Sequence, residues 1–194
     1  MMSLLKYRFI LLFLAPSMIC QAKGNTLYKV ASSNVSFSSR APFELINATS
    51  VSLVGVLDTA KNIFLFKMNI SSFEGFNNPL QKEHFNEDYM ESAQYPDAVY
   101  RGKIIENIDY KHSGTYQVRT KGVFTIHGVS HECLIQSTLK IMGQKIFIIS
   151  DFQVLLRNYN IKIPRIVHNN ISQQINISVK ATMVPKNNWS KTTE

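Results

Sequence analysis

The sequence predicts an all-β fold, an eight-stranded antiparallel barrel with a short helical insertion. The clearest observation lies between Asn170 and Met183, where apolar side chains alternate with polar ones. Side chains on a strand point alternately to its two faces, so this segment has one apolar face. The same alternation recurs along most of the chain, and short polar turns join the segments. Consecutive hairpins of this kind favour an up-and-down meander, and eight strands suffice to close it.

Residues 1–22 have the pattern of a secretory signal peptide. Lys6 and Arg8 precede a short apolar run over residues 9–15, and small residues stand at alternate positions just before Lys23. The run is too short to cross a bilayer, which takes about 20 residues. We therefore expect a signal peptide cleaved after Ala22 and a secreted protein.

The remainder is expected to form one domain over residues 23–184, followed by a disordered polar tail over 185–194. After the leader, no stretch is long and apolar enough to span a membrane. The chain has 21 Lys and Arg against 13 Asp and Glu, and the excess is spread along it rather than gathered in blocks. This distribution indicates a mildly basic soluble surface and no nucleic-acid partner.

The two cysteines have different expected roles. Cys20 lies in the leader, and a lipoprotein would be acylated there, although the bulky Ile19 precedes it where a small residue is preferred. The choice between a soluble and an anchored form stays open. Removal of the leader leaves Cys133 alone, so no internal disulfide is expected. Cys133 shares an apolar strand face with Ile135 and Leu139, which predicts a buried, inert thiol.

The strands are expected to follow one another along the chain, because each apolar alternation ends at a polar or glycine turn. The turns are Asp58 to Asn62, His127 to Ser130, and Gly143-Gln144. The eight predicted strands are 27–38, 49–58, 62–70, 98–106, 115–127, 131–142, 145–156 and 172–184.

One segment departs from this pattern and predicts helix. Asn78 suits an N-cap and Pro79 suits the first helical position. We expect one helix or two short ones over residues 80–93, with Asn86 able to cap a second piece, ending before Tyr95-Pro96. Its apolar contacts are Leu80, Phe85, Tyr89 and Met90. Its acidic side chains, a solvated face or a docking surface, are Glu83, Glu87, Asp88 and Glu91.

No catalytic or metal-binding pattern stands out. The chain has no hydrolase elbow, glycine-rich phosphate loop or Cys-x-x-Cys pair. His127 and His131 stand four residues apart around a glycine turn, but zinc needs three or four converging ligands. We expect no catalytic residue, metal or cofactor, and we interpret His127 as a turn residue bonded to the backbone.

The inward face supplies the candidate binding residues. Those expected to hold an apolar ligand are Phe64, Phe66, Met68, Tyr116, Val118, Phe124, Ile126, Ile135, Phe152, Val154, Ile175, Ile177 and Val179. Arg157 follows an apolar strand and would contact a polar head group at the rim, or lie on the surface. An eight-stranded barrel is wide enough either to be filled by its own side chains or to hold one ligand. Alternation does not separate these two outcomes.

Three motifs resemble the YceI-like, lipid- and polyisoprenoid-binding family. Gly122 to Ser130 is similar to its Gly-x-Leu-Thr-Ile-His-Gly-Val-Thr segment, and Tyr95-Pro96 to its Tyr-Pro before a strand. Residues 155–161 are similar to its strand-end Arg-x-Asp-Phe-Gly. The resemblance covers residues 27–184. It implies a lipocalin-like barrel with a helical insertion at one end, and a long apolar pocket that holds an isoprenoid chain or other amphiphile in the bacterial periplasm.

Two departures concern the ligand. Residues 81–85 lack the Arg-Asp-x-His-Leu pattern associated with isoprenoid-binding members, and Asn158-Tyr159-Asn160 replaces Asp-Phe-Gly. Three hypotheses follow. The first is a periplasmic lipid- or polyisoprenoid-binding protein, and the second a cell-envelope interaction protein with a filled barrel and no ligand. The third is a barrel-pocket enzyme that uses His84 or His127. The oligomeric state, a homodimer included, stays open.

Overall fold

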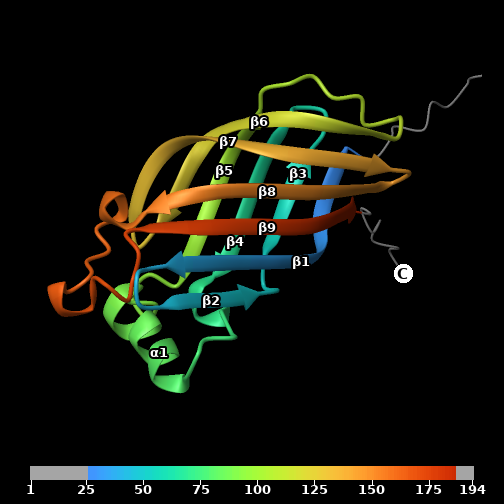
Figure 1. Cartoon of the computed structure of the whole chain (residues 1–194). Coiled ribbons are helices and arrows are strands. Elements are labelled where there is room, and N and C mark those ends of the chain that lie inside the picture. The colour runs from blue at the N-terminus through green and yellow to red at the C-terminus, as the bar shows by residue number, and fades with distance from the viewer. Residues whose placement is uncertain (1–25, 187–194) are drawn as a thin grey trace, which may run out of the picture.

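Strand β1 (Leu27–Arg40) closes the sheet, because it pairs with strands from both ends of the chain (Figure 1). The computed structural model describes residues 26–186. The other strands are β2 (Leu45–Ser50), β3 (Val54–Asp58), β4 (Ile63–Asn69), β5 (Asp97–Ile104), β6 (Gly114–Ile126), β7 (Val129–Met142), β8 (Lys145–Leu155) and β9 (Gln174–Pro185). All pairings are antiparallel, and β1 pairs with β9 from Tyr28↔Pro185 to Ser39↔Ile175.

Strands β2 and β3 share one position in the barrel. β2 pairs with the second half of β1, and β3 pairs with the first three residues of β1. The nine strands therefore form an eight-stranded antiparallel barrel in meander order, which confirms the predicted fold class. The predicted single strand 49–58 was wrong in detail, because the chain turns a corner at residues 51–53 between β2 and β3.

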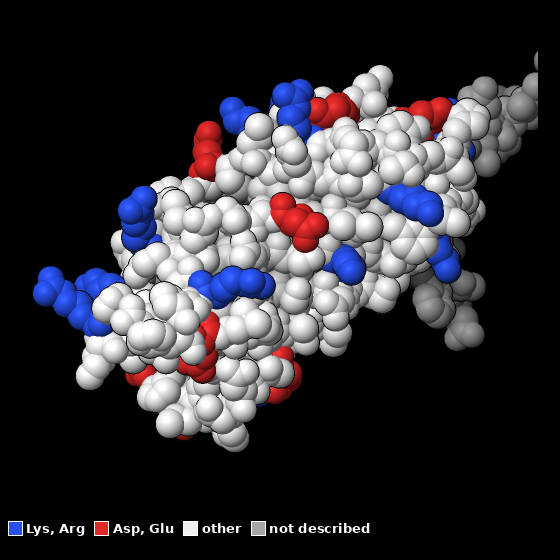
Figure 2. All heavy atoms as spheres, in the orientation of Figure 1, with Lys and Arg blue, Asp and Glu red and all other residues white. Residues whose placement is uncertain are grey.

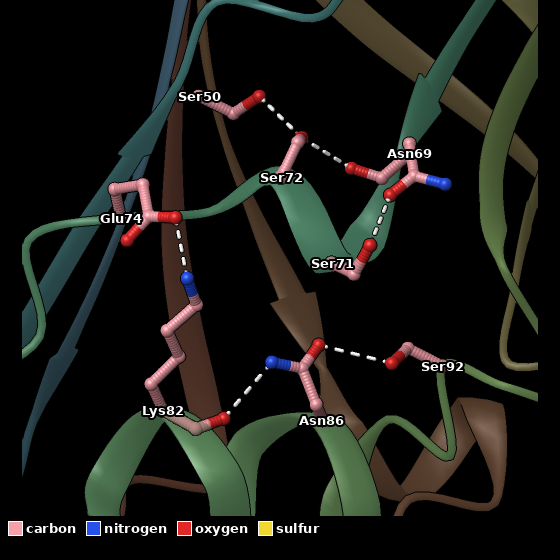
Figure 3. Close-up of polar contacts among 8 residues, drawn as sticks. All are labelled: Ser50, Asn69, Ser71, Ser72, Glu74, Lys82, Asn86 and Ser92. Carbon is pink, nitrogen blue, oxygen red and sulfur yellow. Dashed lines mark hydrogen bonds and ion pairs between the residues drawn. The ribbon is translucent and has the colours of Figure 1, made fainter. Parts of the chain in front are cut away.

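Serine hydroxyls hold this corner. Ser50 Oγ accepts a hydrogen bond from the backbone N–H of Ser52 at 3.1 Å. Ser72, in the short 3-10 helix η1 (Ile70–Ser72), bonds the Ser50 hydroxyl at 2.7 Å and donates to the carbonyl of Asn69 (Figure 3). It also bonds the Ser52 hydroxyl at 2.6 Å. These side-chain bonds compete with the ladder and turn the backbone out of the strand.

The corner leaves β2 without a strand neighbour on its outer edge. Among the described residues, its backbone partner there is Glu74, through the Thr49↔Glu74 bridge. The helical insertion lies against this end of the barrel, below β1 and β2 in Figure 1. An ion pair between Lys82 and Glu74 ties the insertion to the bridge (Figure 3).

The insertion begins where predicted. α1 (Pro79–His84) has Asn78 as its N-cap, whose Oδ1 accepts from the N–H of Gln81 at 2.8 Å. The helix passes directly into a π-helical turn, η2 (Phe85–Tyr89), so the segment is continuous. The prediction that Asn86 caps a second helix was wrong. Its amide donates to the Lys82 carbonyl and accepts from Ser92 Oγ, because it already lies inside the helical segment (Figure 3).

The barrel interior has two packed clusters, one at each end. The cluster at the α1 end includes Phe37, Met68 and Tyr159. The cluster at the far end, beside the β7–β8 turn, includes Leu57, Ile141 and Met183. The remaining described helices are η3 (Leu156–Tyr159) and η4 (Arg165–Val167) in the β8–β9 connection. Within residues 26–186 no helix has the length and apolar character that a membrane span needs.

The predicted leader, residues 1–22, lies outside the described residues, as does most of the predicted tail. Pro185, placed in the tail by the sequence, is instead the last residue of β9 and pairs with Tyr28.

Candidate functional site

An apolar cavity of about 490 Å³ lies inside the barrel between its two ends. Every strand contributes to its wall, and so do α1, η2 and the β8–β9 connection. Small-molecule pockets have volumes of about 300–1,000 Å³ and are lined mostly by apolar side chains. The barrel is therefore not filled by its own side chains, and its interior offers a space of ligand size.

All but three of the residues expected to hold a ligand line this cavity. They are Phe64, Phe66, Met68, Phe124, Ile126, Ile135, Phe152, Val154, Ile175, Ile177 and Val179. The other three lie elsewhere. Tyr116 and Val118 pack in the cluster at the far end and do not line the cavity, although their paired residues on β7, Leu139 and Ser137, do. Arg157 is exposed on η3 and does not line the cavity, since the chain leaves the strand before reaching it.

Four phenylalanines at the α1 end join the insertion to the barrel. Phe37 of β1 stacks on Phe85 with ring centroids 5.3 Å apart, and Phe73 meets Phe37 edge-on at 5.0 Å. Phe76 lies 5.1 Å from Phe85. All four line the cavity. Phe37 continues the alternation of the first predicted strand, which could have identified it, but Phe73 and Phe76 lie outside any periodic segment.

A second aromatic group comes from β4, β5, β6 and β8, with Tyr159 of η3 packed against it. Tyr100 lies 4.9 Å from Phe64 and 6.2 Å from Phe124, which in turn meets Phe152 and Tyr159 edge-on. The Tyr100 hydroxyl donates to the Thr120 carbonyl at 3.0 Å. Burial raises the pKa of Tyr100 well above its ordinary value, so the phenol stays neutral.

Four Ser and Thr hydroxyls interrupt the apolar wall, and each has a partner in the protein. Ser39 accepts from the N–H of Ser172 at 2.9 Å. Thr120 donates to the Ile135 carbonyl at 3.0 Å. Ser137 donates to Ser150 at 3.0 Å, and Ser150 donates to a backbone carbonyl of β7. Hydroxyls that are already hydrogen-bonded cost little to bury, so the wall stays compatible with an apolar ligand.

The charged and amide side chains of the cavity lining gather at its α1 end around Glu44, and we take this end as the entrance. One carboxylate oxygen accepts from Gln81 Nε2 at 2.8 Å and Asn77 Nδ2 at 3.3 Å, and the other accepts from Asn170 Nδ2 at 3.2 Å. Glu44, Gln81 and Asn170 line the cavity. These bonds connect the β1–β2 hairpin, α1 and the β8–β9 connection. The polar rim that the sequence assigned to Arg157 is thus formed by a carboxylate and amides.

The Thr-Ile-His-Gly motif has a positioning role. His127, in the β6–β7 turn, bonds the Tyr159 carbonyl through Nδ1 at 3.0 Å and Glu91 Oε2 through Nε2 at 2.8 Å. The Tyr95 ring packs edge-on against it at 4.6 Å. As expected, His127 bonds the backbone in a turn. The same contacts join the end of the insertion to η3.

Neither metal chemistry nor thiol chemistry is indicated. His131 Nε2 bonds the Asn158 carbonyl at 2.6 Å, and His127 bonds the carbonyl of the next residue, Tyr159. Over residues 26–186 no three His, Cys, Asp or Glu side chains gather as a metal site would require. Cys133 is partly buried, and burial raises the pKa of its thiol, which lowers its reactivity.

A family model described as the YceI-like domain matches residues 28–183. The chain belongs to the YceI-like domain family. The match extends from β1 to β9, and the resemblance noted at residues 122–130 includes the β6–β7 turn that holds His127.

Solved structures share this YceI-like fold at low identity. A polyisoprenoid-binding domain from Saccharophagus degradans implicated in plant cell wall breakdown has a TM-score of 0.70 and 15% identity, covering 82% of this chain and 98% of its own. BcnA of Burkholderia cenocepacia has a TM-score of 0.65 and 14% identity, and the alignment covers 77% of this chain and 95% of BcnA. The YCEI protein of Campylobacter jejuni has a TM-score of 0.55 and 18% identity, and the alignment covers 70% of this chain and 81% of that protein. A search of curated proteins found no match.

Proposed function

We propose that this protein binds an amphiphilic lipid or polyisoprenoid chain and holds it in the barrel cavity. The observation that carries the proposal is the apolar cavity of about 490 Å³, walled by every strand and reaching the polar residues around Glu44. Transfer of an apolar chain from water into such a space is favourable. The fold neighbour from Saccharophagus degradans is itself a polyisoprenoid-binding domain, which supports the same ligand class.

The cavity favours one orientation of the ligand. An apolar tail would lie between the Phe37 group and the wall formed by Tyr100, Phe124 and Phe152. A head group with a hydroxyl or amide would reach Glu44 and the amides of Gln81 and Asn170, which offer both donors and acceptors. Binding by burial of apolar area with a few polar contacts is the usual design of such sites.

The surroundings of the histidines support binding rather than catalysis. Of the two histidines considered for an enzyme, His127 does not line the cavity, and both its ring nitrogens are bonded, to the Tyr159 carbonyl and to Glu91. The second hypothesis, an interaction protein with a filled barrel, has less support because the interior is hollow. The proposal includes export to the periplasm, which rests on the leader pattern of residues 1–22.

The test is native purification without detergent, followed by solvent extraction and mass spectrometry. We expect an amphiphile in stoichiometric amount. A matched pair of variants on β9 locates it: Ile177→Trp reduces the cavity, whereas Lys180→Trp adds the same side chain on the exposed face. We expect only Ile177→Trp to lose the ligand. A protein that carries no amphiphile and also binds no hydrophobic fluorescent probe would contradict the proposal.

A further inference from the structure

Three segments around the cavity entrance each expose a large apolar side chain. Phe43, in the β1–β2 hairpin, is 75% exposed, and Ile166 of η4 is 90% exposed. Leu80, in the first turn of α1, is 58% exposed. Single exposed apolar residues are common on proteins, but several at one site mark an interaction surface.

Hydrogen bonds hold these segments beside one another. The N–H of Phe43 donates to the Asn169 carbonyl at 3.0 Å, which joins the hairpin to the β8–β9 connection. Glu44 bonds Gln81 and Asn170, which brings α1 to the same place. The chain neighbours of the exposed residues line the cavity, so all three segments border its entrance. We call residues 40–44, 79–81 and 162–168 the rim.

The rim also carries unneutralised positive charge. Arg40, Lys162 and Arg165 are exposed, and none has an ion pair within residues 26–186. No Asp or Glu occurs anywhere between Phe152 and Lys186. Figure 2 shows Lys and Arg at the end of the molecule formed by the β8–β9 connection, with Asp and Glu below, around α1. The charge at the entrance is therefore divided: the β8–β9 connection is basic, the hairpin carries both Arg40 and Glu44, and the acidic side chains lie around α1.

We propose that the rim docks on an anionic lipid bilayer, so that a ligand passes between bilayer and cavity without crossing water. This inference rests on the proposed function, since a carrier of lipid must load or unload at a membrane. Apolar side chains enter the boundary between head groups and acyl chains, while Lys and Arg are attracted to anionic lipid. Either contribution alone is weak, and the rim combines both.

The partner that fits best is a bilayer rather than a protein. The exposed apolar residues come from one hairpin, one strand connection and one helix turn, which offer points of insertion rather than a continuous groove. The free cations on the same segments match anionic head groups in sign. The docking surface also continues into the apolar cavity, as transfer of a lipid requires.

Vesicle flotation tests the inference. One set of vesicles contains phosphatidylcholine alone, and the other contains equal parts of phosphatidylcholine and phosphatidylglycerol. We expect the wild-type protein to bind the anionic set more tightly and to lose affinity as salt is added, because salt screens the attraction. Each charge removed by Lys162→Gln or Arg165→Gln is expected to weaken binding about fivefold.

Matched variants separate the rim from the rest of the surface. Phe43→Ser with Ile166→Ser should reduce anionic-vesicle binding at least as much as one charge removal. The control is Met142→Ser with Lys145→Gln at the β7–β8 turn, where Met142 is 50% exposed at the far end of the barrel. The control should bind as the wild type does, and thermal unfolding should show that all variants fold.

Each outcome decides between the two proposals. Rim variants that keep their extractable amphiphile but no longer float with vesicles would support docking. If the wild-type protein carries an amphiphile but does not bind anionic vesicles, docking is overturned and the proposed function is still supported. Equal loss in the rim variants and the far-end control would also overturn it, since binding would then follow total charge. Unchanged vesicle binding by the rim variants would overturn docking through the rim.

Discussion

The Nε2 atom of His127 lies 2.8 Å from Oε2 of Glu91, although the two residues come from elements that share no strand pairing. His127 occupies the β6–β7 turn with a φ of 52°, and Glu91 follows the helical insertion with a φ of 44°. The other ring nitrogen faces the carbonyl of Tyr159. A carbonyl and a carboxylate are both hydrogen-bond acceptors, so the ring lies between two acceptors that come from different elements.

We predict that His127→Ala loosens the end of the insertion without unfolding the barrel. The ring is nearly buried, with a side-chain exposure of 10%, and its loss leaves the Tyr159 carbonyl without this donor. The expected cost is about 1–3 kcal/mol, measured by urea unfolding. Hydrogen exchange should accelerate in residues 85–95 more than in β6 and β7.

The control for this variant is His84→Ala. His84 also pairs with an acid, Asp88, but both side chains are about half exposed. Exposed pairs contribute little, so we expect a change below about 1 kcal/mol. Equal effects of the two substitutions would show that the position of His127 has no special role.

A second prediction concerns the glycine that follows His127. Gly128 has a φ of 70°, and a Cβ there would lie 2.6 Å from Cε1 of Tyr95. Gly128→Ala therefore combines a left-handed backbone with a steric clash. Gly143→Ala, in the β7–β8 turn, has a φ of 58° but no atom within 4 Å, so it isolates the backbone contribution of roughly 1–2 kcal/mol.

We expect Gly128→Ala to destabilise the protein more than Gly143→Ala in urea unfolding. The difference should shrink in a Tyr95→Ala background, because the clashing ring is then absent. A difference that persists unchanged in that background would exclude the clash as its cause.

The third prediction is an energetic coupling between Phe37 and Phe85. Their rings stack with centroids 5.3 Å apart and an interplanar angle of 13°, and they join the barrel to the insertion. A double-mutant cycle with leucine at both positions should give a coupling of about 0.5–1.5 kcal/mol. The pair Phe37 and Phe64, which belong to different clusters, should give additive effects. Additivity in the first cycle would contradict the contact.

The fourth prediction is a loss of stability at alkaline pH. Burial, with a smaller contribution from Cys133, raises the pKa of Tyr159 from 10.0 to about 12. Between these values the phenol is ionised in the unfolded chain and protonated in the folded one. The unfolded state then binds fewer protons, so the free energy of unfolding falls as pH rises from about 10 to 12.

Urea unfolding over this pH range checks the sign. Tyr159→Phe removes the ionisation while keeping the ring, so its free energy of unfolding should fall less steeply than that of the wild type. Tyr100 and Tyr110 also have pKa values raised by burial, so part of the dependence should remain. A wild-type curve that rises between pH 10 and 12 would contradict the assignment.

The sequence by itself determined the barrel and which side chains face its interior. Alternation with a period of two identifies the inner face of β4, β8 and β9, and all the predicted ligand-facing residues on those strands line the cavity. The Asn78-Pro79 pair identified the start of α1 for an equally local reason, because a cap depends on residues within one turn.

Only the tertiary structure decided where the interior is hollow. Val118 and Phe124 share one face of β6, yet the first is packed at the far end and the second lines the cavity. A period of two encodes the face of a strand but not the depth along the barrel. That depth depends on how side chains from eight positions around the ring fill each level, and on corners such as the one between β2 and β3. The same reasoning explains why Phe73, Phe76 and Glu44 came into view only in the folded protein, where distant segments meet at the entrance.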